Sequence, residues 1–80
     1  MKIQEYAEVL VKSICKEPDL VKVSEYESEE GIILDILVLE SDMGAVIGKD
    51  GRNAKAIRTM LNLFAYIHEL GHIKVNIDSF

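Results

Sequence analysis

The chain has 80 residues, of which 49% are hydrophobic and 29% are charged, and its formal net charge is −5. This length allows one small domain without a deep active-site cavity, and the composition predicts a folded chain rather than a disordered tail. No apolar run approaches the roughly 18 to 20 residues that a membrane span requires, and the N-terminus lacks the basic start and apolar core of a signal peptide. We therefore expect one cytoplasmic domain over residues 1–80, with no membrane partner.

The first element is predicted to be a helix over residues 3–16, because apolar residues recur at steps of three and four: Ile3, Ala7, Leu10, Val11 and Ile14. Pro18 ends this helix, since the residue before a proline avoids helical geometry. The single cysteine, Cys15, has no disulfide partner and is expected to pack as a small apolar residue. A half-exposed strand should then run from Leu20 to Ser28, with alternating apolar and polar residues.

After an acidic turn that ends at Gly31, the segment from Ile32 to Leu39 is almost entirely apolar and rich in β-branched residues. Only Asp35 interrupts it. This composition is typical of a central strand that helices cover on one face. The residues expected on the covered face alternate along the strand, and they are Ile32, Leu34, Ile36 and Val38.

A short helix over residues 43–47 is predicted next, with Ser41 or Asp42 as its N-cap. The glycines of the loop 48–51 interrupt it, and a longer helix should then extend from Arg52 to Leu70 and close at Gly71. A last strand follows, in which Ile73, Val75 and Ile77 alternate with polar residues. The predicted order is therefore α-β-β-α-α-β, an α+β fold.

The most informative segment is Val46-Ile47-Gly48-Lys49-Asp50-Gly51-Arg52-Asn53-Ala54-Lys55-Ala56-Ile57-Arg58. Its two glycines allow a sharp turn and a close approach to a partner, and a helix N-terminus follows that favours phosphate. Residues 48–58 hold four cations and one anion, so their net charge is +3. Because the whole chain has a net charge of −5, the other residues together carry −8. A basic island on an acidic body predicts local, salt-sensitive binding of nucleic acid.

This segment resembles the G-x-x-G signature of the KH domain, whose loop clamps about four nucleotides of single-stranded RNA or DNA. The order of elements resembles the type II, prokaryotic KH arrangement, a three-stranded sheet covered on one face by helices. The whole chain looks most similar to the KhpA family of small bacterial KH proteins. The resemblance implies an RNA chaperone or post-transcriptional regulator that pairs with a second, longer KH protein and influences cell elongation and envelope synthesis.

The expected RNA-binding residues are those of the loop and its flanks: Val46, Ile47, Gly48, Lys49, Asp50, Gly51, Arg52, Lys55 and Arg58. The glycines bring the backbone close to phosphate, the cations supply charge, and bases should lie over Val46, Ile47 and the adjacent strand. Asp50 lowers the loop charge, although its carboxylate can accept hydrogen bonds from a base or from the N-terminus of the next helix. The sequence leaves open which bases are preferred and whether RNA or single-stranded DNA is bound.

The long helix carries two apolar faces, one with Ala54, Ile57, Leu61, Phe64 and His68 and the other with Ala56, Met60, Leu63 and Ile67. Since only one face can pack on the sheet, we predict that Met60, Leu63 and Ile67 form a dimer interface. The alternative is that part of this second face packs under the N-terminal helix. Whether the partner is a second copy or a larger KH protein stays open.

Two other functions remain as alternatives to RNA binding. The chain could be a protein-interaction module that recruits another KH protein, with RNA contact incidental. The segment His68-Glu69-Leu70-Gly71-His72 matches the H-E-x-x-H pattern of zinc peptidases, but Gly71 is expected to take His72 out of helical register. We therefore predict no enzyme activity, catalytic residue, metal, cofactor or small-molecule substrate.

Overall fold

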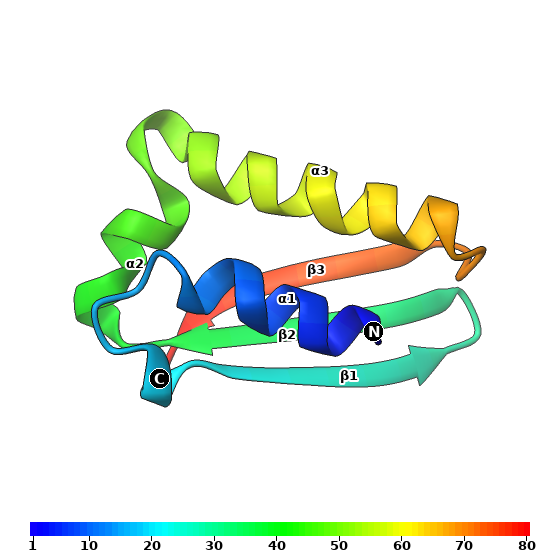
Figure 1. Ribbon diagram of the computed structural model, residues 1–80, viewed down its shortest axis with the longest axis horizontal. Helices are drawn as coiled ribbons and strands as arrows, with labels where there is room; N and C mark the ends of the chain where they lie inside the picture. The colour runs from blue at the N-terminus through cyan, green and yellow to red at the C-terminus, as the bar shows by residue number, and fades with distance from the viewer.

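The computed structural model describes residues 1–80 and has the predicted order of elements (Figure 1). The helices and strands are α1 Ile3–Lys12, β1 Lys22–Ser28, β2 Gly31–Val38, α2 Glu40–Ile47, α3 Arg52–Ile67 and β3 Ile73–Ser79. Short 3-10 turns occupy Pro18–Leu20 and Lys49–Gly51. The expectation of a type II KH fold is confirmed. None of the helices is both long and apolar enough to span a bilayer.

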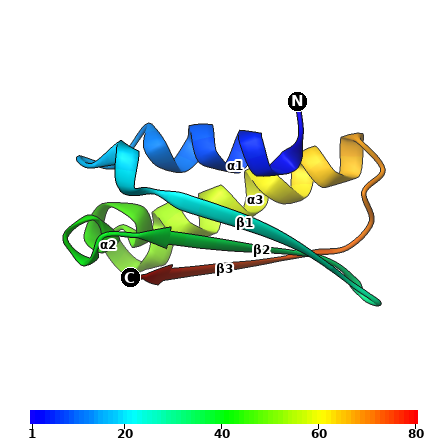
Figure 2. The ribbon, with the colours of Figure 1, turned by 90° about the horizontal axis from the view of Figure 1, so that it is seen from below.

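The three strands form a mixed sheet in the order β1-β2-β3. β1 and β2 pair antiparallel through a tight connection, whereas β2 and β3 pair parallel. A parallel pair requires a crossover, and here α2, the glycine loop and α3 provide it. Helices α1 and α3 lie on one side of the sheet, and α2 lies near the end where β2 and β3 finish (Figures 1 and 2). The opposite face of the sheet carries no helix.

The core lies between this sheet and the two helices above it. In β2 the side chains of Leu34, Ile36 and Val38 are fully buried, and Ile32 is half-buried, so the predicted covered face is confirmed. Most of the predicted helix faces are buried, from α1 Ile3, Ala7 and Val11, and from α3 Ala54, Ile57 and Leu61. Leu10 and Phe64 are half-buried, Ile14 and His68 are exposed, and Ala65, which was not predicted, is buried. Burial of these side chains is the main stabilising contribution.

The first helix is shorter than expected, because α1 ends at Lys12 rather than near residue 16. The hydroxyl of Ser13 donates a hydrogen bond to the Leu10 carbonyl at 2.6 Å, which competes with continued helical bonding. A 3-10 turn at Pro18–Leu20 then delays the start of β1 until Lys22. Cys15 is half-buried and packs against the core, as expected for a small apolar residue.

The expected capping role of Ser41 or Asp42 is wrong. Helix α2 begins at Glu40 after Leu39, and no side chain caps it. Asp42 lies inside the helix and is buried, and its carboxylate accepts hydrogen bonds from the backbone N–H groups of Lys16 at 3.0 Å and Glu17 at 3.2 Å. The carboxylate therefore joins α2 to the segment that links α1 to β1.

Candidate nucleic-acid interface

The loop between α2 and α3, which we call the glycine loop (Gly48–Gly51), is a single tight turn. Three of its residues have left-handed backbone geometry, with φ of 77° at Gly48, 56° at Asp50 and 75° at Gly51. The N–H of Gly51 donates to the Gly48 carbonyl at 3.2 Å and closes the turn. Left-handed geometry is strained for most residues with a Cβ, so the glycines are what permit so short a connection.

Asn53 fixes this turn from the first turn of α3. Its side-chain amide donates a hydrogen bond of 2.7 Å to the carbonyl of Ala45, in the last turn of α2. A Cβ added to Gly48 would lie 2.6 Å from Cγ of Asn53, so the asparagine side chain occupies the space that the glycine leaves free. The sequence predictions did not include Asn53, because nothing in the local pattern indicates which side chain will bond back across a turn.

The four expected cations Lys49, Arg52, Lys55 and Arg58 are all exposed. The structure contains a single ion pair, between Lys12 and Glu8 at 3.8 Å, so none of these four charges is neutralised by a carboxylate. No acidic residue lies in the first turn of α3, and no side chain caps its N-terminus. The positive end of the helix dipole therefore adds to the cations, and this end of the molecule can attract an anion.

Asp50 is exposed at the tip of the glycine loop, and aspartate tolerates its left-handed backbone better than most residues do. The expected hydrogen bond to the N-terminus of α3 is not formed, since the Asp50 carboxylate takes part in none of the hydrogen bonds found. Its charge is therefore directed to solvent within the basic island.

The two apolar residues before the loop differ in position. Val46 is fully buried, so the expectation that bases lie over its side chain is wrong. Its side chain belongs to the core and supports the loop from beneath. Ile47 is half-buried and keeps part of its side chain at the surface next to Gly48. Of these two residues, only Ile47 is accessible.

The second apolar face of α3 is open to solvent. Met60, Leu63 and Ile67 have exposed fractions of 42%, 56% and 63%. The alternative in which this face packs under α1 is therefore wrong for these residues. The side chain that does face α1 is Phe64, whose ring stacks on Tyr6 at 5.0 Å between centroids and on His68 at 4.2 Å.

The H-E-x-x-H pattern does not form its helical geometry. Helix α3 ends at Ile67, earlier than the expected Leu70, and the backbone becomes left-handed at Glu69 and Gly71. His72 follows these turns, and its carbonyl accepts a hydrogen bond from the N–H of Ile32 at 3.0 Å. A zinc peptidase needs both histidines on one helix face, which this chain does not provide. No three metal-ligating side chains of His, Cys, Asp or Glu come together elsewhere.

Comparison with known proteins identifies the family of the chain. The sequence model of the KhpA/KhpB KH domain matches residues 4–77. An RNA-binding protein KhpA from Clostridium perfringens is 48% identical over 63 residues, which cover 79% of this chain and 84% of that protein. The RNA-binding protein KhpA of Borreliella burgdorferi is 44% identical over 61 residues, 76% of this chain and 74% of its own length. The chain therefore belongs to the KhpA/KhpB family of KH-domain proteins.

Proposed function

We propose that this protein binds single-stranded RNA by holding the RNA backbone against the glycine loop. The observation that carries the proposal is the group of four cations without carboxylate partners around a two-glycine turn at a helix N-terminus. The names of the relatives as RNA-binding proteins support it. An acidic body with one basic end favours contact of limited size over coating of the whole surface by nucleic acid.

Each part of the site has a distinct role in this proposal. The glycines let phosphate come close to the backbone of the loop, and Lys49 and Arg52 supply charge-assisted hydrogen bonds. Lys55 and Arg58 extend the positive rim along α3, while Ile47 offers an apolar contact for a base. Val46 acts from the core as a support, and Asp50 lowers the phosphate affinity of the loop. Binding proceeds without any bond-breaking step.

Such a protein would act in the cytoplasm as an RNA chaperone or post-transcriptional regulator, since weak backbone contacts allow strands to be bound and released. The family resemblance connects this role with cell elongation and envelope synthesis. The exposed strip formed by Met60, Leu63 and Ile67 supports pairing with a second copy or with a larger KH protein.

The test is fluorescence anisotropy of a labelled single-stranded RNA at low and moderate salt. A variant with Lys49→Ala and Arg52→Ala removes two cations from the loop. Its matched control, Lys2→Ala with Lys12→Ala, removes one exposed cation at each end of α1 and leaves the loop unchanged. We expect the loop variant to bind at least tenfold more weakly than the control and with a shallower dependence on salt.

Equal affinity of the loop variant and the control would contradict the proposal, because net charge alone would then explain binding. If wild type fails to bind at protein concentrations near 100 μM while it still captures a KH protein, the protein-interaction function replaces RNA binding. The exposed apolar strip is the observation that favours this second function.

A further inference from the structure

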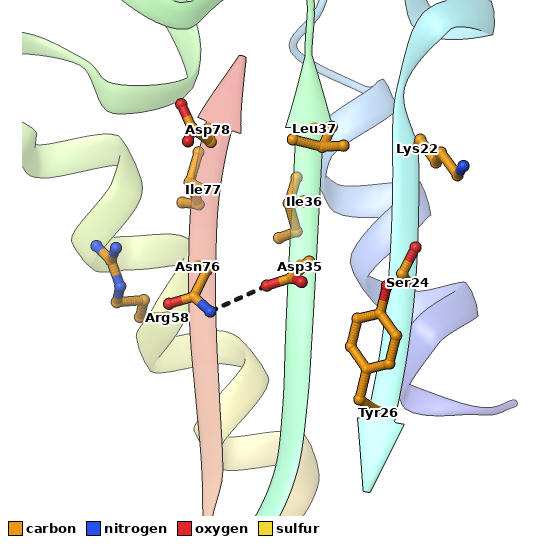
Figure 3. Close-up of a pocket in the computed structure, with 10 residues that line it drawn as sticks. All are labelled: Lys22, Ser24, Tyr26, Asp35, Ile36, Leu37, Arg58, Asn76, Ile77 and Asp78. Carbon is orange, nitrogen blue, oxygen red and sulfur yellow. Dashed lines mark hydrogen bonds between the residues drawn. The ribbon is translucent and has the colours of Figure 1, made fainter. Parts of the chain in front are cut away.

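The face of the sheet that carries no helix contains a shallow hollow of about 600 Å³. Side chains alternate along strands, so the residues between the buried positions of all three strands project onto this open face. Polar and aromatic side chains from each strand line the hollow, among them Ser24, Tyr26, Asp35 and Asn76, and Arg58 reaches it from α3 (Figure 3). Ser24, Asp35 and Asn76 form one row across the sheet, because they are paired in register.

The centre of this row has a fixed hydrogen-bonding pattern. Nδ2 of Asn76 donates to Oδ1 of Asp35 at 2.9 Å (Figure 3). An ionised carboxylate only accepts hydrogen bonds, so the amide nitrogen of Asn76 must face Asp35 and its carbonyl oxygen must face away. The Asp35 carboxylate keeps two neighbouring acceptors for a ligand, Oδ2 and the remaining lone pair of Oδ1. The carboxylate, held in place by Asn76, is therefore suited to a planar group that presents two neighbouring N–H donors.

An aromatic ring flanks this pair. Tyr26 is 54% exposed and lies two residues along β1 from Ser24, with its ring extended toward Ser24 in Figure 3. Adjacent strands are about 5 Å apart, so the ring lies within reach of a group bound at Asp35. Exposed aromatic rings on a sheet stack well with the bases of single-stranded nucleic acid. Tyr26 makes no aromatic pair within the protein, so no other aromatic ring covers its faces.

Arg58 joins the hollow to the basic island. It lies seven residues after Gly51, roughly 10 Å along the axis of α3, and it lies beside β3, on the side away from β2 (Figure 3). The hollow has no net charge, since Lys22 and Arg58 balance Asp35 and Asp78. The chain outside residues 48–58, by contrast, has a net charge of −8. An RNA strand that leaves the glycine loop over Lys55 and Arg58 therefore meets this face without entering the strongly acidic surface.

We infer that the hollow is a second subsite for RNA, which stacks one base on Tyr26 and prefers guanine through the Asp35 carboxylate, which Asn76 holds in place. Guanine is the base whose Watson–Crick edge carries two adjacent donors, N1–H and the 2-amino group, and these match the two acceptors of the carboxylate. The inference rests on the proposed function, because the same strand is held at the glycine loop. A polar row of side chains with one exposed ring favours a nucleotide here over an apolar protein surface.

The test uses short labelled RNAs and anisotropy. The probes are U4, which fills the loop, U8, and two octamers with one guanine at the 5′ or the 3′ end. A further octamer replaces that guanine by inosine, which lacks the 2-amino group. Variants Tyr26→Ala and Asp35→Asn alter the hollow, and Tyr66→Ala and Glu29→Gln are matched controls at exposed positions outside it. The loop variant Lys49→Ala with Arg52→Ala is measured in parallel.

We expect one guanine octamer to bind about tenfold more tightly than U8, and inosine to lose most of this gain. Tyr26→Ala and Asp35→Asn should abolish the guanine preference and leave U4 binding unchanged, while both control variants behave as wild type. If U4 and U8 bind through the loop but no guanine preference exists, or if it survives in both hollow variants, the subsite is refuted and the proposed function stands. If wild type binds no RNA, or the loop variant binds as well as wild type, both are refuted.

Discussion

Asn53 spans the glycine loop, because its side-chain amide donates a 2.7 Å hydrogen bond to the carbonyl of Ala45. This carbonyl lies in the last turn of α2, where backbone acceptors have no partner within the helix. The side chain of Asn53, at the start of α3, thus donates to an unpaired carbonyl at the end of α2. This bond also fixes the orientation of the loop backbone. The loop is organised before any ligand arrives, which lowers the entropy cost of binding.

Replacement of Asn53 by alanine should lower the free energy of unfolding by about 1 kcal/mol, since one hydrogen bond is lost. It should also weaken RNA binding severalfold, because the loop loses the hydrogen bond that fixes its conformation. Asn62→Ala is the matched control, since Asn62 donates a similar bond of 2.8 Å to the Arg58 carbonyl within α3. Urea unfolding and RNA anisotropy measure both effects. An RNA affinity of Asn53→Ala equal to that of Asn62→Ala would show that the bond from Asn53 to Ala45 has no role in binding.

Alanine substitutions at three glycines should separate the cost of a steric clash from the cost of left-handed backbone strain. Gly48→Ala should be the most destabilising, because φ is 77° and the new Cβ would meet the Asn53 side chain at 2.6 Å. Gly51→Ala should cost about 1–2 kcal/mol from left-handed strain alone, since no atom lies within 4 Å of its Cβ position. Gly44→Ala, within α2 and with open space around it, should stabilise the protein by up to about 1 kcal/mol. Thermal unfolding of the three variants tests this order, and any other ranking contradicts the described loop geometry.

The buried carboxylate of Asp42 should be important for stability although Asp42 is not among the expected RNA-binding residues. Asp42→Ala leaves the N–H groups of Lys16 and Glu17 without their acceptor, and we expect a loss of about 2–3 kcal/mol in the free energy of unfolding. Asp42→Ser, which restores a single short acceptor, should lose less. Hydrogen exchange at the amides of Lys16 and Glu17 gives a local readout. Unchanged protection in the alanine variant would mean that these bonds are not formed in solution.

Cys15 gives a prediction for alkaline pH. Burial raises the pKa of the Cys15 thiol, and the nearby Asp42 carboxylate raises the pKa further. Because the unfolded thiol ionises at lower pH than the folded one, the folded state binds more protons above about pH 8.5, and stability falls as the pH rises. Cys15→Ser should remove this part of the pH dependence. The check is urea unfolding of both proteins between pH 7 and 10, and parallel curves would contradict a raised pKa.

The exposed strip of α3 should support self-association or pairing with another KH protein. Leu63→Asp places a charge at the centre of the strip, where 56% of the leucine is exposed, so it should disrupt association and leave the monomer folded. Asn62→Asp adds the same charge on the adjacent face of the helix as a control. Sedimentation velocity over a range of concentrations measures the outcome. Equal association of the two variants would place the interface elsewhere.

Local sequence patterns predicted the order of elements and the covered face of β2, because apolar periodicity is imposed by the core itself. They failed where a contact joins distant segments. Asp42 was interpreted as an N-cap, yet its carboxylate bonds to backbone groups 25 and 26 residues earlier. The burial of Val46 and the bond from Asn53 to Ala45 depend in the same way on packing between elements, whereas the early end of α1 follows a local bond from Ser13 to Leu10. The glycine loop was recognisable because its geometry requires particular residues at fixed spacing.

The most direct test of the central claim is an NMR titration of the ¹⁵N-labelled protein with a short single-stranded RNA. The account predicts that the amide signals of residues 47–52 shift first and furthest, followed by those of Lys55 and Arg58, and that the shifts diminish as salt is added. Shifts confined to the α3 strip or to the acidic surfaces, with the signals of Gly48 and Gly51 unchanged at saturating RNA, would contradict it.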